Sequence, residues 1–173
     1  MPLHRWKING PLGLALLALA YAATPAHALR IVTWNLLQYP TTILATRQPH
    51  FRTVMAAMNA DVLIAQELNS AAGRDSFLNN VLGVVQPGEW AATSWLSLGA
   101  GEGGAVFYKP AKVTVSGLSQ IATSGPRDVL VCLVKPVGYT ATSASTRLYS
   151  VHLKALGPAT VDSTTRRVEC TDI

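Results

Sequence analysis

Two short apolar segments, each ending in a polar side chain, constrain the fold of this chain more than any other feature of its sequence. Residues 29–35 are Leu-Arg-Ile-Val-Thr-Trp-Asn, and residues 61–67 are Asp-Val-Leu-Ile-Ala-Gln-Glu. Both are rich in β-branched and aliphatic residues and have the length of a strand, which is typical of buried strands. We therefore expect Asn35 and Glu67 at one edge of a sheet, where open sheets flanked by helices bind their ligands.

The side chains of Asn35 and Glu67 suit a site for a metal ion or a phosphate. A carboxylate is a ligand for hard divalent cations, and the Asn amide can bond a metal-bound phosphate. Each residue taken alone has a plainer explanation, because polar residues commonly begin the loop that follows a strand. The hypothesis of a site depends on their combination with residues further along the chain.

The first 28 residues have the layout of a secretory signal peptide. Residues 1–10 contain two basic side chains and no acid, residues 11–24 are apolar, and Ala26-His-Ala28 has the small-x-small cleavage pattern. The apolar stretch is shorter than the ~20 residues of a transmembrane helix, although an uncleaved membrane anchor is the alternative. We therefore expect cleavage after Ala28, a secreted or periplasmic location, and a mature domain over residues 29–173.

The mature domain is mildly basic and long enough for one hydrophobic core. Removing residues 1–28 takes away two basic side chains and no acid, so the net charge falls from +5 to +3. Charge therefore permits an anionic substrate but does not predict a nucleic-acid-binding module, which would need a basic stripe. Cys132 and Cys170 could form one disulfide in an oxidising compartment, or each could be a small buried residue.

The hydrophobic pattern predicts a mixed α and β chain in which strands dominate. Apolar residues recur every three or four positions over 46–59, and shorter helices are predicted at 75–82, ended by Gly83, and from 161 onward. Apolar segments bounded by Gly and Pro predict the strands. These are residues 30–36, 61–66, 91–98, 104–108, 112–121, 128–137 and 147–153.

His152 and Glu102 add acid–base chemistry to the two strand ends. His152 lies at the end of the predicted strand 147–153, and histidine is a natural general acid or base near neutral pH. Glu102 precedes the strand 104–108, and its carboxylate could accept the second ring proton of His152 and fix the tautomer. A solvated carboxylate in a Gly-rich turn explains Glu102 equally well.

Five short motifs follow one another along the mature chain. They are Trp34-Asn35, Gln66-Glu67, Glu102 before Val-Phe-Tyr-Lys-Pro110, Val151-His-Leu-Lys154 and Arg166-Arg-Val-Glu169. In this order they resemble the endonuclease/exonuclease/phosphatase superfamily, which contains DNase I-like nucleases, apurinic endonucleases, bacterial sphingomyelinases and inositol-phosphate phosphatases. The resemblance implies an α/β (α+β) fold, an incomplete four-layer α/β/β/α sandwich of the DNase I-like type with mostly antiparallel mixed sheets.

The resemblance implies a role for each candidate residue. Glu67 matches the principal Mg²⁺ ligand. Asn35 matches an asparagine that contacts the phosphate or lies beside the metal, and we expect it as a catalytic residue and a second metal ligand. His152 matches the catalytic histidine of the DNase I-like and sphingomyelinase branches, and Glu102 matches the acid that orients it. Mn²⁺ or Ca²⁺ could replace Mg²⁺, because all three prefer oxygen ligands.

The implied reaction is hydrolysis of a phosphate ester by in-line attack of water. The substrate could be a nucleic acid, a phospholipid head group or a small phosphoester, and we expect a monomer without a stable protein partner. Lys109 and Lys154 could neutralise a phosphate. Trp90 and Trp95 could contact a base or a membrane, although packing in the core is the simpler use of both.

The chain departs from the superfamily pattern after His152. A strand ending in Gly-Asp-Phe-Asn and a terminal Ser-Asp-His are expected there, and neither occurs. Arg166 and Glu169 match helix positions that we interpret as structural. We therefore expect the N-terminal portion of such an enzyme, inactive by itself; the alternative is a non-catalytic exported binding or interaction protein that retains the fold.

Overall fold

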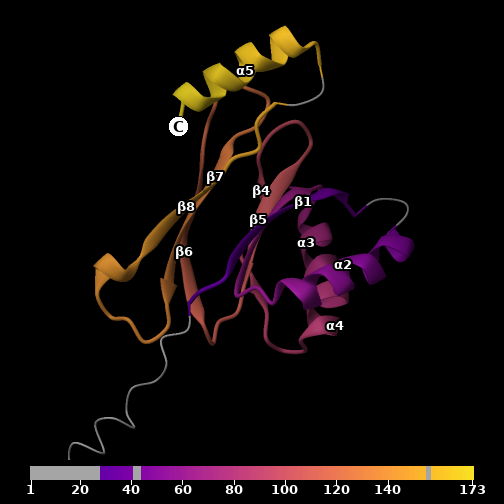
Figure 1. Ribbon diagram of the computed structural model, residues 1–173, viewed down its shortest axis with the longest axis vertical. Helices are drawn as coiled ribbons and strands as arrows, with labels where there is room; N and C mark the ends of the chain where they lie inside the picture. The colour runs from indigo at the N-terminus through magenta and orange to yellow at the C-terminus, as the bar shows by residue number, and fades with distance from the viewer. Residues whose placement is uncertain (1–27, 41–43, 155–156) are drawn as a thin grey trace, which may run out of the picture.

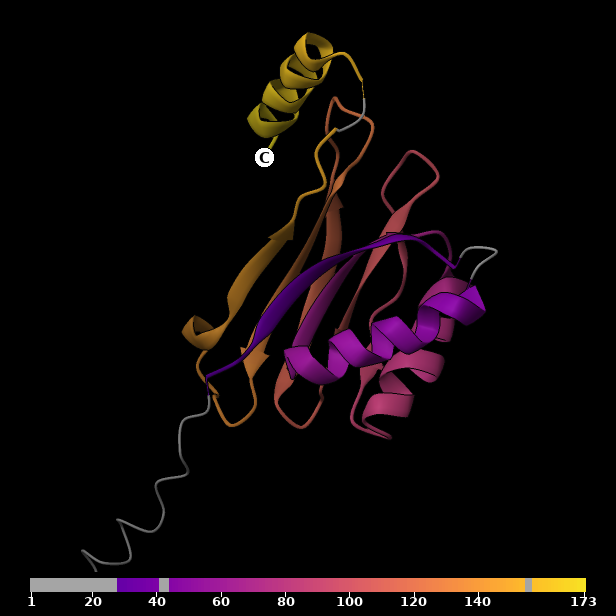
Figure 2. The same ribbon diagram turned by 45° about the vertical axis from the view of Figure 1, so that its right-hand side comes forward.

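The computed structural model describes residues 28–40, 44–154 and 157–173. The signal peptide predicted at residues 1–28 lies outside the described residues except for Ala28. Two β-sheets pack face to face, and helices cover the outer face of the first sheet (Figures 1 and 2). Within the described ranges, no helix has the length and apolar character needed to cross a membrane.

The first sheet contains both of the apolar segments that were predicted as strands. It has the order β1-β2-β5-β3, with β4 also paired to β5. β1 and β2 are parallel with Asn35 opposite Gln66, and β5 is antiparallel to β2. The strands are β1 (Ile31–Tyr39), β2 (Val62–Leu68), β3 (Ala91–Ala92), β4 (Leu96–Ser97) and β5 (Gly103–Tyr108). Because β1 and β2 are parallel, Asn35 and Glu67 meet as predicted, but neither residue ends its strand: β1 continues to Tyr39 and β2 to Leu68.

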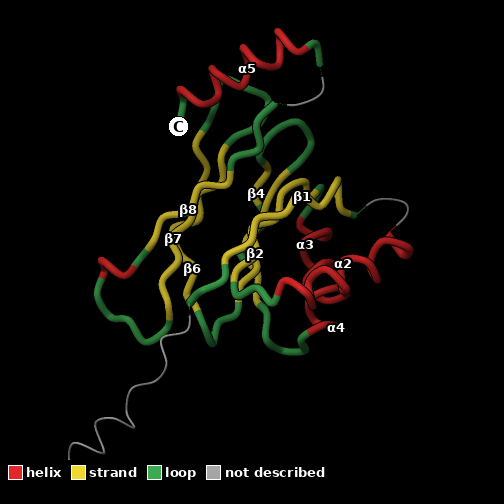
Figure 3. Tube along the Cα trace, in the orientation of Figure 1, coloured by secondary structure: helices red, strands yellow, loops and turns green. Residues whose placement is uncertain are grey.

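The second sheet is a three-stranded antiparallel ribbon in the order β6-β7-β8 (Figure 3). Its strands are β6 (Val113–Ile121), β7 (Val129–Pro136) and β8 (Thr146–Ser150), and the short 3-10 turn η2 (Thr142–Ala144) precedes β8. Inward-facing aliphatic side chains of both sheets form one core between them. This core includes Val62, Ile64, Val106, Val113, Leu130, Cys132 and Val134.

The helices pack against the other face of the first sheet. They are α2 (Leu44–Met58), α3 (Ala71–Phe77), the π-helical turn η1 (Leu78–Leu82) and α4 (Gly83–Val85). The last helix, α5 (Ala159–Thr171), lies at one end of the sandwich (Figure 1). The described residues therefore form three of the four expected layers, since none of their helices covers the outer face of the second sheet.

The first predicted boundary to fail is that of the helix at 75–82. The helix begins earlier because Ser70 caps it, its hydroxyl accepting a hydrogen bond from the Gly73 amide at 3.0 Å. It continues to Val85 because Gly83, with φ of −67°, keeps a right-handed helical backbone and does not end it.

The second prediction to fail is the burial of the strand at 30–36. β1 is an edge strand: Ile31 is 39% exposed, while Val32 and Trp34 on its other face pack against the helix-side core. Among the described strands only β2 pairs with β1. An aliphatic segment therefore predicts a strand correctly but not the burial of both its faces.

The two cysteines are separate, and they are expected to differ in reactivity. Cys132 is buried between the sheets and Cys170 is exposed on α5. Burial raises the pKa of the Cys132 thiol, which keeps it protonated and unreactive. We expect a thiol reagent such as DTNB to modify only Cys170 in the native protein and Cys132 only after denaturation. Fast modification of native C170S would contradict this prediction.

Candidate metal and phosphate site

A bulge at the end of β2 turns Glu67 toward the second sheet. Up to Ala65, even-numbered side chains of β2 face the second sheet and odd-numbered ones face the helices. The register with β1 and β5 then shifts between Gln66 and Leu68, and Glu67 has a left-handed backbone with φ of +56°. Gln66 and Glu67 consequently lie on the same side. Such a conformation is strained for a non-glycine residue, and strain of this kind concentrates at functional sites.

The Asn35 amide is oriented by hydrogen bonds at both ends. Its Nδ2 donates to Glu67 Oε1 at 2.8 Å and lies 3.4 Å from His152 Nε2. Its Oδ1 accepts from the Leu37 amide at 2.8 Å, and Glu67 Oε2 accepts from the Gln38 amide at 3.1 Å. Asn35 therefore directs an N–H group toward the site, which suits a phosphate oxygen. Its role as a metal ligand stays a prediction.

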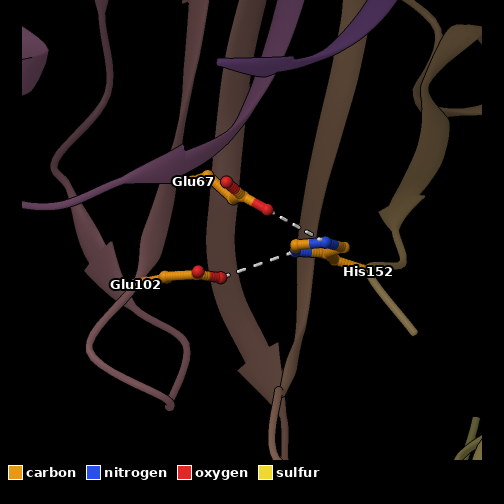
Figure 4. Close-up of side chains that lie close together, drawn as sticks. All are labelled: Glu67, Glu102 and His152. Atoms are coloured by element: carbon orange, nitrogen blue, oxygen red, sulfur yellow. Dashed lines mark ion pairs between the residues drawn. The ribbon is translucent and has the colours of Figure 1, made fainter. Parts of the chain in front are cut away.

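His152 faces two carboxylates, which approach the ring from the same side (Figure 4). Its Nε2 is 3.4 Å from Glu67 Oε1, and its Nδ1 is 3.8 Å from Glu102 Oε2. β8 ends at Ser150, so His152 follows the strand instead of lying within it, unlike the predicted strand 147–153. The separation from Glu102 is too long for a hydrogen bond, and it is that of an ion pair only when the ring is protonated.

Glu102 is buried and pairs with Arg127, a residue that the sequence did not indicate. Arg127 Nε donates to Glu102 Oε2 at 2.9 Å, the same oxygen that faces His152. Only 8% of Glu102 is exposed, so it is not a solvated carboxylate of the turn. The sequence pattern does not indicate the role of Arg127, because this residue lies in a Gly-Pro-Arg loop and its partner is 25 positions away in the sequence.

The surroundings of His152 favour its neutral form. Burial lowers the pKa of His152, and the positive charge of Arg127 lowers it further. The carboxylates of Glu67, Glu102 and Glu169 act in the opposite direction, but the pKa remains below its ordinary value. The imidazole can therefore accept a proton near neutral pH.

Glu67, Glu102 and His152 could together hold a divalent cation. One ligand atom from each lies within 4.8 Å of the other two. The carboxylates are the hard oxygen ligands that Mg²⁺, Mn²⁺ and Ca²⁺ prefer. The N–H groups that donate to the Glu67 carboxylate, those of Asn35 and Gln38, are uncharged. Glu102, in contrast, is already paired with the positive charge of Arg127. Glu67 is therefore the better ligand, and the donor set fits the predicted metal.

The remaining candidates lie away from this group. Lys109 follows β5 at the opposite end of the sheet, where its Nζ is 3.1 Å from Glu89 and 5.3 Å from the Trp90 ring centre. Trp95 donates its indole N–H to the Leu68 carbonyl at 2.9 Å. Both tryptophans pack against the helix-side core, which is the simpler of the two roles that the sequence suggests for them.

No protein-family profile and no curated protein matches this chain by sequence. Solved structures match it by fold. The human Nocturnin catalytic domain with bound sulfate has a TM-score of 0.60 at 12% identity, over 83% of this chain and 56% of that one. D. rerio TDP2 complexed with a single-strand DNA product has a TM-score of 0.57 at 20% identity, over 79% and 50%.

An endonuclease/exonuclease/phosphatase family protein from Bacteroides thetaiotaomicron matches with a TM-score of 0.52 at 14% identity, over 75% of this chain and 52% of that one. The chain thus spans about half the length of the structures that it matches. At these identities the similarity concerns the fold alone. The chain therefore shares the DNase I-like fold of these structures, the fold that its sequence motifs predicted.

Proposed function

We propose that this chain is the metal- and phosphate-binding portion of an exported, Mg²⁺-dependent phosphoesterase. The observation that carries the proposal is the convergence of Asn35, Glu67 and His152, which come from three distant segments and lie within 2.8–3.4 Å of one another. The sulfate bound to Nocturnin and the DNA product bound to TDP2 support a phosphate ester as the ligand.

Each residue of the group has a distinct task in this proposal. Mg²⁺ held by Glu67 would supply charge stabilisation for the phosphoryl oxygens. Asn35 Nδ2 donates to a phosphate oxygen, and the neutral His152 accepts a proton at Nε2. Glu102 faces Nδ1 and stabilises the ring once it is charged, while Arg127 keeps the Glu102 carboxylate in place.

Metal titration of the 173-residue chain tests the binding part of the proposal. We expect saturable binding of Mg²⁺ and Mn²⁺ by isothermal titration calorimetry, reversed by EDTA. Absence of saturable binding of either ion would contradict it.

Hydrolysis is tested on DNA, a phosphate monoester and sphingomyelin. Because neither the Asp-x-Asn nor the Ser-Asp-His motif occurs in the sequence, we expect this chain alone to hydrolyse none of them above the EDTA background. Turnover that depends on Mg²⁺ would show that the site works without those motifs, and would contradict the expected inactivity.

A non-catalytic binding protein that retains the fold is the second candidate, favoured by the same missing motifs. The genomic DNA downstream of codon 173 distinguishes the two. Gly-Asp-x-Asn and Ser-Asp-His in any reading frame would support the phosphoesterase. A stop codon followed by no such remnant would support the binding protein.

Export has its own test at the N-terminus. When the chain is expressed from its own start codon in a bacterium, we expect the periplasmic or secreted protein to begin at Leu29, because Ala26 and Ala28 fit the signal peptidase site. Intact-mass measurement of the exported fraction checks this. A bulky A28F substitution should retain the uncleaved chain, and an unprocessed wild-type protein in the cytoplasm would contradict the prediction.

A further inference from the structure

Strand pairing does not hold the segment that carries His152. β8 ends at Ser150, and residues 151–154 pair with no described strand. Their position therefore depends on hydrogen bonds to side chains. Before His152, Gln66 Nε2 donates to Ser150 Oγ and to the Val151 carbonyl, both at 3.1 Å. After His152, α5 makes hydrogen bonds to the backbone of Lys154.

Three side chains on one face of α5 contact a single residue, Lys154. Glu169 Oε2 accepts from the Lys154 amide at 2.9 Å, and Arg166 Nη1 donates to the Lys154 carbonyl at 3.1 Å. Asp162 Oδ1 lies 3.5 Å from Lys154 Nζ. The spacings of four and three positions place these side chains on one helix face. Both backbone polar groups of Lys154 are thus bonded by the same helix.

The same helix also contacts the loop that carries Arg127. Asp172 Oδ2 accepts from the Ser124 amide at 2.6 Å, and Glu169 packs so closely on Gly125 that a Cβ there would overlap its carboxylate. Arg127 follows two positions later and bonds Glu102, which faces His152 Nδ1. α5 therefore holds the two segments whose side chains meet in the site.

The burial pattern of α5 is the reverse of that of a helix that covers a core. Glu169 and Asp162 are 1% and 5% exposed, whereas Val161 and Val168 are 57% and 40% exposed. Glu169 Oε1 is buried without a hydrogen-bond partner. Burial of carboxylates costs stability, whereas burial of the valines would add to it. Packing stability alone does not account for the orientation of this helix.

We propose that Glu169 and Arg166 are positioning residues, which fix the Lys154 backbone and so hold the His152 ring against the carboxylates of Glu67 and Glu102. This positioning role concerns the same site as the proposed function, and it rests on the proposed function only for what His152 does. It replaces the interpretation of Arg166 and Glu169 as merely structural.

The test uses the full chain with ¹⁵N-labelled histidine rings, whose His152 signals are identified by their loss in H152Q. In E169A the acceptor for the Lys154 amide is lost, so we expect the His152 ring signals to shift and Lys154 amide exchange to accelerate by about tenfold or more, since hydrogen bonds to charged groups are strong. R166A should shift the same ring signals.

Two further variants serve as controls. E169Q keeps an oxygen acceptor but removes a charge that raises the pKa of His152, so all ring signals are compared at about pH 8, where the ring is neutral in every variant; there we expect E169Q to restore the wild-type signals. R167A changes the next residue of α5, which is exposed, and should alter neither signal. If neither alanine variant folds by near-UV circular dichroism, E169Q decides, and altered His152 signals in that variant would overturn the proposal.

Unchanged His152 signals in folded E169A and R166A would also overturn it, even with faster exchange at Lys154. Mn²⁺ titration of the same samples distinguishes failure of the proposed function from failure of the positioning role. A wild-type protein that binds no Mn²⁺ contradicts the proposed function, while shifted ring signals in the α5 variants would still support the positioning role.

Discussion

E67Q is expected to weaken the binding of Mg²⁺ and Mn²⁺ by at least about 100-fold. Changing a residue that only supports a ligand costs about 10–100-fold in metal affinity, so loss of the principal carboxylate should cost more. Gln has the size of Glu and can keep an oxygen near the Asn35 amide. The variant therefore removes the charge without opening a cavity.

E89Q is the matched control for this substitution. Glu89 is an exposed carboxylate that is paired with Lys109 and lies far from the site. Its loss should leave the affinity for either ion unchanged. Isothermal titration with both variants measures the difference, and equal affinities in E67Q and wild type would rule out Glu67 as a ligand.

F77A is expected to lower the free energy of unfolding by about 3–5 kcal/mol. Phe77 of α3 is fully buried and is surrounded by the rings of Trp34, Tyr39, Phe51 and Phe107, at centroid distances of 5.2–6.4 Å. Truncation leaves a cavity where α2, α3 and the first sheet meet. Rigid rings of this size cannot readily fill it.

Urea unfolding monitored by tryptophan fluorescence measures this loss. V84A on α4 provides the comparison, because Val84 is 52% exposed and its truncation should change the free energy by less than about 0.5 kcal/mol. F77L keeps part of the side-chain volume, so its loss of unfolding free energy should lie between those of F77A and V84A. A loss below about 1 kcal/mol in F77A would mean that the aromatic cluster is not the core of this face.

The sequence predicted the parts of the fold that depend on local pattern. The apolar segment before Glu67 forms a central strand, β2, and the periodic segment at 46–59 forms most of α2, as predicted. The meeting of Asn35 with Glu67 was also predictable, because both belong to apolar segments of a kind that form parallel strands in open sheets, although both strands continue past these residues. Periodicity thus located the edge of the sheet where the site lies.

The finer geometry of the site could not be predicted in this way. Alternation along β2 would turn Glu67 toward the helices, and only the bulge reverses it. The partnership of Arg127 with Glu102 depends on a loop and a strand end 25 positions apart, and loops carry no periodic signal. The contacts of α5 with Lys154 likewise depend on tertiary packing.

In the proposed function, Asn35, Glu67 and His152 form a site for a divalent cation and a phosphate. A crystal of the protein grown with Mn²⁺ tests it most directly, through an anomalous difference map. We predict a peak about 2.1 Å from a Glu67 carboxylate oxygen, the distance of a hard divalent cation from its oxygen ligands. Mn²⁺ peaks only elsewhere, with Glu67 bonded solely to Asn35 and the Gln38 amide, would contradict it.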